Sequence, residues 1–344
     1  NPSSGHWAAA GAEAVLDEAR GQVAALLGAE RDEIVFTSGG SEANNLALKG
    51  VACALQAKGN HIVTSAVEHP AILVPCRFLE RQGFQMSIVP VDRFGRVDPD
   101  DVARAITPQT VLVSVMHANN EVGTIQPIAE VSRIARARGV LLHTDAAQSV
   151  GKIATDVNGL GVDLLTVAGH KLYAPKGVGA LYIRRGTPIE PLVHGAGHEG
   201  GRRAGTETAL LAAGLGAACR LARNLAPMEG VRALCDRLWQ RLQVDLGDRI
   251  VLNGHPNQRL PNTLNVSFVG RVGAEVLARL DGVAASTGSA CHAGRVELSP
   301  VLKAMGVAPE AGMGAIRFSL GRGTTTKEVD VVADRLARIL APTA

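Results

Sequence analysis

Residues 34–41 read Ile-Val-Phe-Thr-Ser-Gly-Gly-Ser, an apolar run that ends in a glycine-rich turn. Because β-branched and aromatic residues favour strands, we expect a strand over 34–37, and the apolar pattern after the turn predicts a helix over 41–58. Similar short runs predict strands at 61–65, 111–116, 140–144 and 164–167. Longer helical patterns, such as 128–138, separate these runs. Strands that alternate with helices predict an α/β protein with a mostly parallel sheet.

Two domains are expected, a large one over residues 1–225 and a smaller α+β one over 226–344. A chain of 344 residues is long enough for about two domains. In the first domain, the run at 179–184 follows a tight Pro-Lys-Gly turn, so we expect it to pair antiparallel with a neighbour. In the second, the sequence predicts helices at 229–246, 275–280 and 327–340 and apolar runs at 264–268 and 316–320.

Composition and charge argue against several classes of protein. The chain has 35 Lys and Arg against 32 Asp and Glu, and only 3% of its residues are aromatic. It therefore lacks the basic surface and the stacking side chains that are typical of nucleic-acid-binding proteins. No apolar run reaches the ~18 residues that a membrane-spanning helix needs. The five cysteines include no CxxC pair, so we expect neither disulfides nor a metal, and a cytoplasmic, reducing environment.

The turn that contains Gly40 and Ser41 is a candidate phosphate site. The first backbone N–H groups of a helix have no partner within the helix, and the helix dipole favours an anion at that end. Glycine permits the tight turn, and the Ser41 hydroxyl adds a further donor. The alternative is that Ser41 only caps its helix.

Two ionisable side chains follow successive apolar strands. Asp145 comes at the end of the run at 140–144, and Lys171 follows the run at 164–167. A lysine beside a buried strand is costly unless it is paired or neutral, and a neutral lysine can form a Schiff base with an aldehyde. A carboxylate is the partner that a protonated pyridine nitrogen requires. With the phosphate site, these residues predict three contacts to pyridoxal 5′-phosphate; a plain Asp145–Lys171 ion pair is the alternative.

Cys291 lies in a stretch of small residues. Residues 286–294 read Ser-Thr-Gly-Ser-Ala-Cys-His-Ala-Gly, which predicts a flexible, exposed loop. A thiol in such a loop beside His292 is suited to form a thiolate and attack an electrophile, although an incidental cysteine remains the alternative. The other four cysteines lie in apolar surroundings, where we expect them to serve packing. These are Cys53, Cys76, Cys219 and Cys235.

Several longer motifs resemble one known family in the same order along nearly the whole chain. They are TSGGSEANN (37–45), EHPAI (68–72), HANNEVGTIQPI (117–128), HTDAAQS (143–149), GHKLYAPKGVGALY (169–182), RRAGTE (202–207) and GSACHAG (288–294). The chain resembles the cysteine desulfurases, class V enzymes of fold type I that use pyridoxal 5′-phosphate and include selenocysteine lyases. The resemblance implies a large domain with a mostly parallel seven-stranded sheet and a small α+β C-terminal domain that carries the cysteine loop.

The same resemblance implies roles for individual residues. Lys171 binds the cofactor covalently, Asp145 pairs with its ring nitrogen, and His69 stacks on the ring and assists proton transfer. Asn120 and Arg317 hold the substrate carboxylate, and Asn120 also lies at the cofactor. The remaining cofactor contacts are Gln148 to the ring hydroxyl and Gly40, Ser41 and His170 to the phosphate. Thr206 reaches the phosphate of the other subunit, which implies a homodimer.

The implied reaction converts L-cysteine to L-alanine, with Cys291 taking the sulfur as a persulfide for delivery to an acceptor protein. A selenocysteine lyase is the nearest alternative. Another Cβ-lyase or aminotransferase with a non-essential Cys291, or a sulfur-delivery scaffold without turnover, also remains open. The chain departs from the family pattern at Ala168, where Ser or Thr is usual, and at His292, which is less typical of iron–sulfur-assembly enzymes. It also begins after the opening strand of that pattern.

Overall fold

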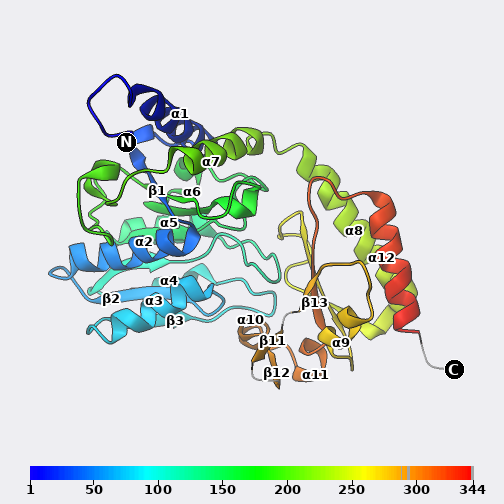
Figure 1. The fold of residues 1–344 in the computed structure, drawn as a ribbon. Coiled ribbons are helices and arrows are strands. Elements are labelled where there is room, and N and C mark those ends of the chain that lie inside the picture. Colours follow the sequence, from blue (N-terminus) through cyan, green and yellow to red (C-terminus); the bar gives the residue numbers. More distant parts are fainter. Residues whose placement is uncertain (288, 293–294, 342–344) are drawn as a thin grey trace. The chain divides into compact units, whose positions relative to one another are not determined.

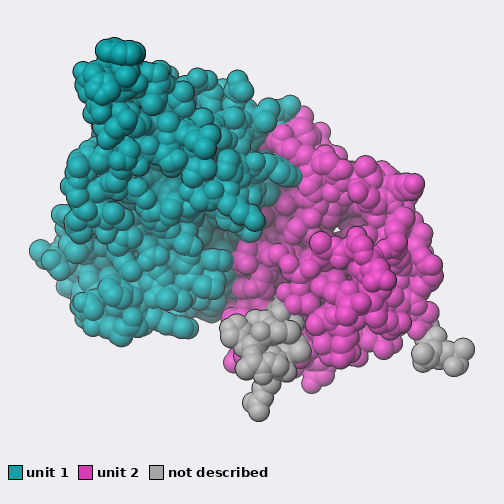
Figure 2. All heavy atoms as spheres, in the orientation of Figure 1, with its two compact units in different colours: residues 1–90, 97–118, 126–224 teal, residues 91–96, 119–125, 225–344 magenta. Residues whose placement is uncertain are grey.

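The computed structural model describes residues 1–287, 289–292 and 295–341, with side chains over 1–287 and 297–341. The chain forms two compact units, coloured separately in Figure 2. Unit 1 comprises residues 1–90, 97–118 and 126–224, and unit 2 comprises 91–96, 119–125 and 225–344. Two short segments that precede residue 225 thus belong to unit 2. The domain boundary at 225/226 stays a prediction.

Unit 1 contains a seven-stranded sheet with the order β1-β7-β6-β5-β4-β2-β3. Figure 1 labels three of its strands, β1, β2 and β3. The strands are β1 (Ile34–Thr37), β2 (His61–Ser65), β3 (Gln85–Val89), β4 (Thr110–Ser114), β5 (Leu141–Asp145), β6 (Leu164–Ala168) and β7 (Gly179–Ile183). Only β7 runs antiparallel to its neighbours, β1 and β6, as expected from the tight turn before it. The mostly parallel sheet is therefore confirmed. The sequence analysis missed β3, an edge strand that alternates polar and apolar residues and is buried mainly at Val89.

Helices surround this sheet, and α2 and α3 bury apolar residues against it. They are α1 (Ala10–Leu27), α2 (Gly40–Leu55), α3 (Pro70–Glu80), α4 (Pro99–Ala105), α5 (Ile128–Ala137), α6 (Val157–Leu160) and α7 (Ala209–Ala222), with 3-10 turns η1 (Arg31–Glu33), η2 (Gly169–Leu172) and η3 (His198–Gly201). Leu46 of α2 and Ile72 of α3 share one buried cluster with Ile62, Leu112 and Leu164 of the sheet. This core fixes the strand ends that carry the candidate site.

The register of the sheet brings the carboxyl ends of β1, β6 and β5 together. Thr37 at the end of β1 and Ala168 at the end of β6 both lie opposite Gly179. Asp145 at the end of β5 lies opposite Thr166 of β6. Position 179 must be glycine, because a Cβ there would lie 2.6 Å from the carbonyl oxygen of Val167 and 2.8 Å from the backbone of the turn after β1. Open α/β sheets bind ligands at this edge.

Unit 2 is an α+β unit, as expected. A four-stranded antiparallel sheet has the order β10-β13-β9-β8, and β11 pairs with β12. The strands are β8 (Ile250–Asn253), β9 (Thr263–Phe268), β10 (Ser286–Thr287), β11 (Ser289–His292), β12 (Arg295–Leu298) and β13 (Ala315–Ser319). The helices are α8 (Pro227–Leu246), η4 (Gly247–Arg249), α9 (Gly273–Ala278), α10 (Pro300–Ala304), α11 (Pro309–Gly312) and α12 (Thr326–Ile339). Leu242, Phe268, Phe318 and Leu336 lie in its core.

Around Cys291, where the sequence predicts a flexible, exposed loop, the described backbone forms short strands. Residues 286–287 pair with β13, and β11 pairs with β12 so that Cys291 lies opposite Val296. Small residues do not prevent strand pairing, because the backbone supplies its hydrogen bonds. The expected flexibility of this stretch stays a prediction. Across the part of the chain that the structure describes, no helix combines the length and the apolar character needed to cross a bilayer.

Candidate active site

Asp145 is a buried carboxylate at the end of β5. It is 5% exposed, and its Oδ2 accepts a hydrogen bond from Nδ2 of Asn44 over 2.7 Å, while Oδ1 accepts one from the N–H of Ala147 over 2.9 Å. Burial raises the pKa of Asp145, and the hydrogen bonds from Ala147 and Asn44 and the charge of His69 oppose that rise. Such a carboxylate is suited to pair with a cationic ring nitrogen.

The sequence analysis did not single out Asn44. It lies in the first turns of α2, is 1% exposed and presents its amide to Asp145. A signal for it was present in the sequence, because position 44 falls three residues after Ser41 on a helix and therefore on nearly the same face. An asparagine on a buried helix face indicates a polar partner, because an unpaired buried amide is costly.

Lys171 follows the strand that lies next to β5. It belongs to η2, directly after β6, and β6 is the parallel neighbour of β5. Lys171 and Asp145 therefore follow adjacent strands at the same edge of the sheet. Lys171 is exposed in the single chain. The residue is therefore accessible at the sheet edge that carries Asp145.

A second amine, missed by the sequence analysis, lies close to Lys171. Lys152 donates hydrogen bonds from Nζ to the carbonyl oxygens of Gln148 and Lys171 over 2.8 and 3.3 Å. Burial, followed by the positive charge of Lys171, lowers the pKa of Lys152 to about 8. Lys152 therefore links the backbone of two predicted cofactor contacts and is itself easily neutralised.

The turn after β1 carries the predicted phosphate site. Helix α2 begins at Gly40, and Ser41 is exposed. A Cβ at position 40 would lie 3.1 Å from the Cβ of Ala168 and 3.7 Å from Cγ2 of Thr166, so glycine lets the start of α2 pack closely against β6. The first N–H groups of α2 are free of helix partners at this point. The buried carboxylate, the amine and this turn are of the chemical types that pyridoxal 5′-phosphate requires, and all three lie at one sheet edge.

His69 follows β2 and begins helix α3. Its Nδ1 accepts a hydrogen bond from the N–H of Ala71 over 3.1 Å, which leaves Nε2 as the nitrogen that carries a proton in the neutral ring. The preceding residue, Glu68, is buried and accepts hydrogen bonds at Oε1 from Ser65 Oγ and from the N–H of Met116. Burial, together with the charge of Asp145, raises the pKa of Glu68 to about 8 although these hydrogen bonds oppose the rise.

Three other predicted cofactor residues also belong to unit 1. His170 is exposed beside Lys171, and burial and the charges of nearby lysines, led by Lys171, lower its pKa. Gln148 follows β5, and its carbonyl oxygen binds Lys152. Thr206 is exposed on the loop after η3. The roles of these residues stay predictions.

In unit 2, Arg317 and Asn120 lie in contact. The Nη1 of Arg317 donates to the carbonyl oxygen of Asn120 over 2.7 Å, and Nη2 donates to Oγ of Ser286 over 3.1 Å. The Nε atom of Arg317 is buried and has no hydrogen-bond partner among the described residues. The guanidinium is therefore held in place with donor capacity remaining. Ser286 is a contact that the sequence analysis missed, because the pairing of β10 with β13 creates it.

The cysteines whose side chains are described differ in burial. The side chain of Cys291 lies outside the described side chains, so its predicted role is not tested. Burial raises the pKa of Cys76, Cys219 and Cys235 to about 12, which suits packing. The packing expected for Cys53 is wrong, because Cys53 is exposed on α2. An apolar sequence context did not specify which helix face it occupies.

Within the described residues, no cluster of three or more His, Cys, Asp or Glu could hold a metal ion.

Comparison with known proteins identifies the family. The class-V aminotransferase family model matches residues 1–332. The cysteine desulfurase IscS of Dictyoglomus turgidum is 48% identical over 344 residues, which cover 99% of this chain and 87% of that protein. The cysteine desulfurase of Mus musculus is 46% identical over 327 residues, which cover 94% of this chain and 71% of that protein. A solved NifS-like protein superposes with a TM-score of 0.92 at 37% identity, covering 99% of this chain and 91% of that one. The chain therefore belongs to the cysteine desulfurase family of class-V aminotransferases.

Proposed function

We propose that this protein removes sulfur from L-cysteine, releases L-alanine and transfers the sulfur to Cys291 as a persulfide. It is a cysteine desulfurase by family, and pyridoxal 5′-phosphate is the cofactor of that family. The observation that carries the proposal is the buried carboxylate of Asp145, held by Asn44 beside the strand that leads to Lys171. A buried charge of this kind is costly unless a cationic ligand group uses it.

When bound, pyridoxal 5′-phosphate would supply an electron sink for the negative charge that develops at the substrate Cα. Asp145 would keep the ring nitrogen protonated, and Asn44 would keep Asp145 ionised. The amine of Lys171 would anchor the cofactor and, once displaced by substrate, would take the Cα proton. Nε2 of His69 would stand near the ring as a proton carrier. The proposed remaining contacts are Gln148 with the ring hydroxyl, Asn120 with the cofactor, and Gly40, Ser41 and His170 with the phosphate.

Arg317 would bind the carboxylate of L-cysteine with the help of Asn120. A guanidinium presents several donors in one plane, which matches a carboxylate. Two of its donors are already used by Asn120 and Ser286, so its orientation is fixed before substrate arrives. Preorganisation of this kind lowers the entropy cost of binding.

The thiolate of Cys291 would attack the sulfur of the bound substrate. One S–S bond forms and the Cβ–S bond breaks, and its electrons return to the amino-acid fragment, which takes up protons and leaves as alanine. The persulfide would then pass to an acceptor protein. The enzyme would work as a homodimer in which Thr206 completes the phosphate site of the other subunit. A cytoplasmic location would keep Cys291 reduced.

An alanine-formation assay with L-cysteine and with L-selenocysteine tests the proposal. We expect turnover of L-cysteine in the wild type and its loss in Cys291→Ala. Cys53→Ala is the matched control, because Cys53 is an exposed cysteine on α2, in the half of that helix remote from Gly40 and Ser41. Full desulfurase turnover by Cys291→Ala would favour a lyase in which that cysteine is not essential. Turnover of selenocysteine alone would favour the selenocysteine lyase.

A further inference from the structure

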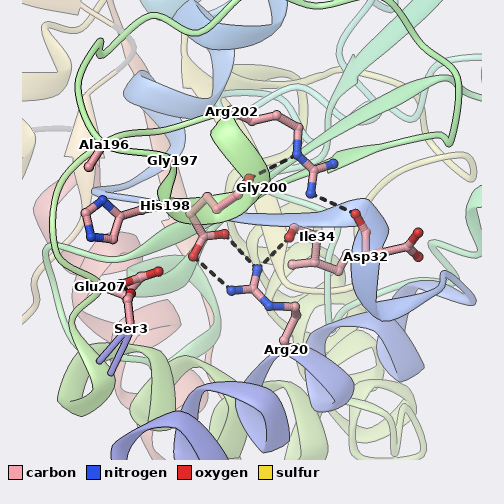
Figure 3. A pocket seen from close by; sticks show the side chains of 11 residues that line it. Ser3, Arg20, Asp32, Ile34, Ala196, Gly197, His198, Gly200, Arg202 and Glu207 are labelled. Carbon is pink, nitrogen blue, oxygen red and sulfur yellow. Dashed lines mark hydrogen bonds and ion pairs between the residues drawn. The ribbon is translucent and has the colours of Figure 1, made fainter. Parts of the chain in front are cut away.

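A largely buried ion pair joins helix α1 to the 3-10 turn η3, after which the chain continues to Thr206; its dashed lines are drawn at Arg20 in Figure 3. Arg20 donates from Nη1 and Nη2 to the two carboxylate oxygens of Glu199 over 2.7 and 2.9 Å, and the Glu199 side chain is 1% exposed. Burial by itself lowers the pKa of Arg20, yet the hydrogen bond and the charge of Glu199 outweigh it and leave that pKa above its ordinary value. A bidentate pair between a guanidinium and a carboxylate is strong and fixed in direction.

The same ion pair supplies hydrogen-bond partners to the outer edge of strand β1. Strand β1 is the terminal strand of its sheet, so one edge has no neighbouring strand in the described sheet. On that edge, the carbonyl oxygen of Ile34 accepts from Nη1 of Arg20 over 2.6 Å, and the N–H of Phe36 donates to Glu199 over 2.9 Å. The Arg20 guanidinium also lies 4.7 Å from the centre of the Phe36 ring. The ion pair thus takes the place of a further strand.

A second ion pair ties the same loop to the far side of the turn after β1. Nε of Arg203 donates to Glu42 over 2.9 Å, and the N–H of Ser38 donates to the other oxygen of Glu42 over 2.8 Å. Burial alone raises the pKa of Glu42, but the hydrogen bonds of Arg203 and Ser38 outweigh it and lower the pKa. The loop therefore holds the chain at Phe36 and, through Glu42, at Ser38, on either side of Thr37.

The backbone at Glu199 shows that its side chain is needed there. Glu199 has φ 51° and ψ 37°, and Gly200 follows with φ 64° and ψ 31°. The left-handed region favours glycine and costs other residues energy, so a glutamate persists there only when its side chain makes compensating contacts. Its three hydrogen bonds, two with Arg20 and one with Phe36, are those contacts.

We propose that Glu199 is a positioning residue for the cofactor phosphate. It fixes the loop at 198–206 and the turn that carries Gly40 and Ser41 to each other, so that phosphate donors are in place before the cofactor arrives. The inference rests on the proposed function, in which Gly40 and Ser41 serve the chain's own site and Thr206 serves that of the other subunit. The Arg20–Glu199 ion pair would then hold phosphate contacts of both active sites of the dimer in place.

Titration of the cofactor-free full chain with pyridoxal 5′-phosphate and with pyridoxal, followed by protein fluorescence, tests this inference. The two ligands differ only in the phosphate. Because a hydrogen bond to a charged group is worth enough to change affinity by about tenfold, Glu199→Gln should raise the dissociation constant of pyridoxal 5′-phosphate by about that factor. The constant for pyridoxal should stay nearly unchanged. Arg185→Gln, which breaks the exposed ion pair of Arg185 with Asp32, is the control and should alter neither constant.

A second variant, Arg203→Gln, keeps the inference testable if Glu199→Gln does not fold, because the Arg203–Glu42 pair is less buried. It should also weaken binding of pyridoxal 5′-phosphate more than binding of pyridoxal. If a folded variant binds both ligands equally more weakly, or binds neither more weakly, this inference is overturned while the proposed function stands. A wild-type chain that binds pyridoxal 5′-phosphate no better than pyridoxal contradicts the proposed function as well.

Discussion

The amide of Asn44 donates a hydrogen bond to Asp145, with 2.7 Å between Nδ2 and Oδ2, and both side chains are buried. The Oδ1 atom of Asn44 has no hydrogen-bond partner among the described residues. An unpaired buried carbonyl is costly, so the hydrogen bond that the amide donates to Asp145 is the interaction that explains its position. The contact favours the ionised form of a carboxylate whose pKa burial raises.

Asn44→Leu should therefore weaken the pairing of Asp145 with the cofactor ring. Without the amide, the pKa of Asp145 rises further, because a hydrogen bond that favours the carboxylate is lost. Because a hydrogen bond to a charged group contributes about 1.5–3 kcal/mol, we expect kcat/KM for L-cysteine to fall at least about tenfold. The absorbance spectrum of the bound cofactor should also change its dependence on pH.

Asn60→Leu is the control for this variant, because it removes an exposed amide that binds only the carbonyl oxygen of Gly83 among the described residues. It should keep wild-type kinetics. A loss of activity in Asn44→Leu with an unchanged pH dependence of the spectrum would mean that Asn44 serves only the fold.

Glu68→Gln should flatten the dependence of stability on pH. The folded chain raises the pKa of Glu68 to about 8 from an ordinary value of 4.5. Between these values the folded state holds a proton that the unfolded state has released, so the stabilisation is complete below pH 4.5 and is lost as pH rises through about 8. Gln cannot ionise and has the shape of the protonated acid. Thermal unfolding midpoints between about pH 5 and pH 8 measure the effect.

Glu80→Gln provides the comparison, because Glu80 is exposed on α3. That variant should retain the wild-type pH dependence. If Glu68→Gln also retained it, burial of Glu68 would not control the stability of the chain in this pH range.

Arg317→Lys should raise the KM for L-cysteine more than it lowers kcat. A lysine keeps the positive charge but loses the planar fork and the simultaneous contacts with Asn120 and Ser286. We expect an increase in KM of roughly tenfold or more, since charge-assisted hydrogen bonds are the strong ones. Steady-state kinetics of alanine formation measure both constants. Arg338→Lys, on the exposed face of α12, should behave as wild type, and an unchanged KM in Arg317→Lys would remove Arg317 from the substrate site.

The sequence predicted the strands that carry the site because they are short apolar runs with a polar residue at the end. Asp145 and Lys171 were found in this way, and the register of β5 with β6 gives the physical reason why they lie at one edge. Strand β3 was missed because an edge strand needs no continuous apolar run. The exposed position of Cys53 could not be predicted either, since the apolar pattern around it does not fix the rotation of α2.

Contacts between residues distant in sequence were harder to predict. Asn44 and Asp145 meet only after α2 packs on the sheet, and no local pattern links them. Arg20 and Glu199 also meet only in the folded chain, where both bind the outer edge of β1. Family motifs name residues but not these supporting contacts, which depend on how the sheet and its helices pack.

The central claim is that the amine of Lys171 anchors the cofactor. Reduction of the holoenzyme with borohydride, followed by peptide mass mapping, tests it directly. The account predicts a phosphopyridoxyl group on Lys171 and none in Lys171→Ala. Lys152 is the competing amine, because its pKa is lowered to about 8 and its Nζ lies 3.3 Å from the carbonyl oxygen of Lys171. A label on Lys152, with Lys171 unmodified, would contradict the account.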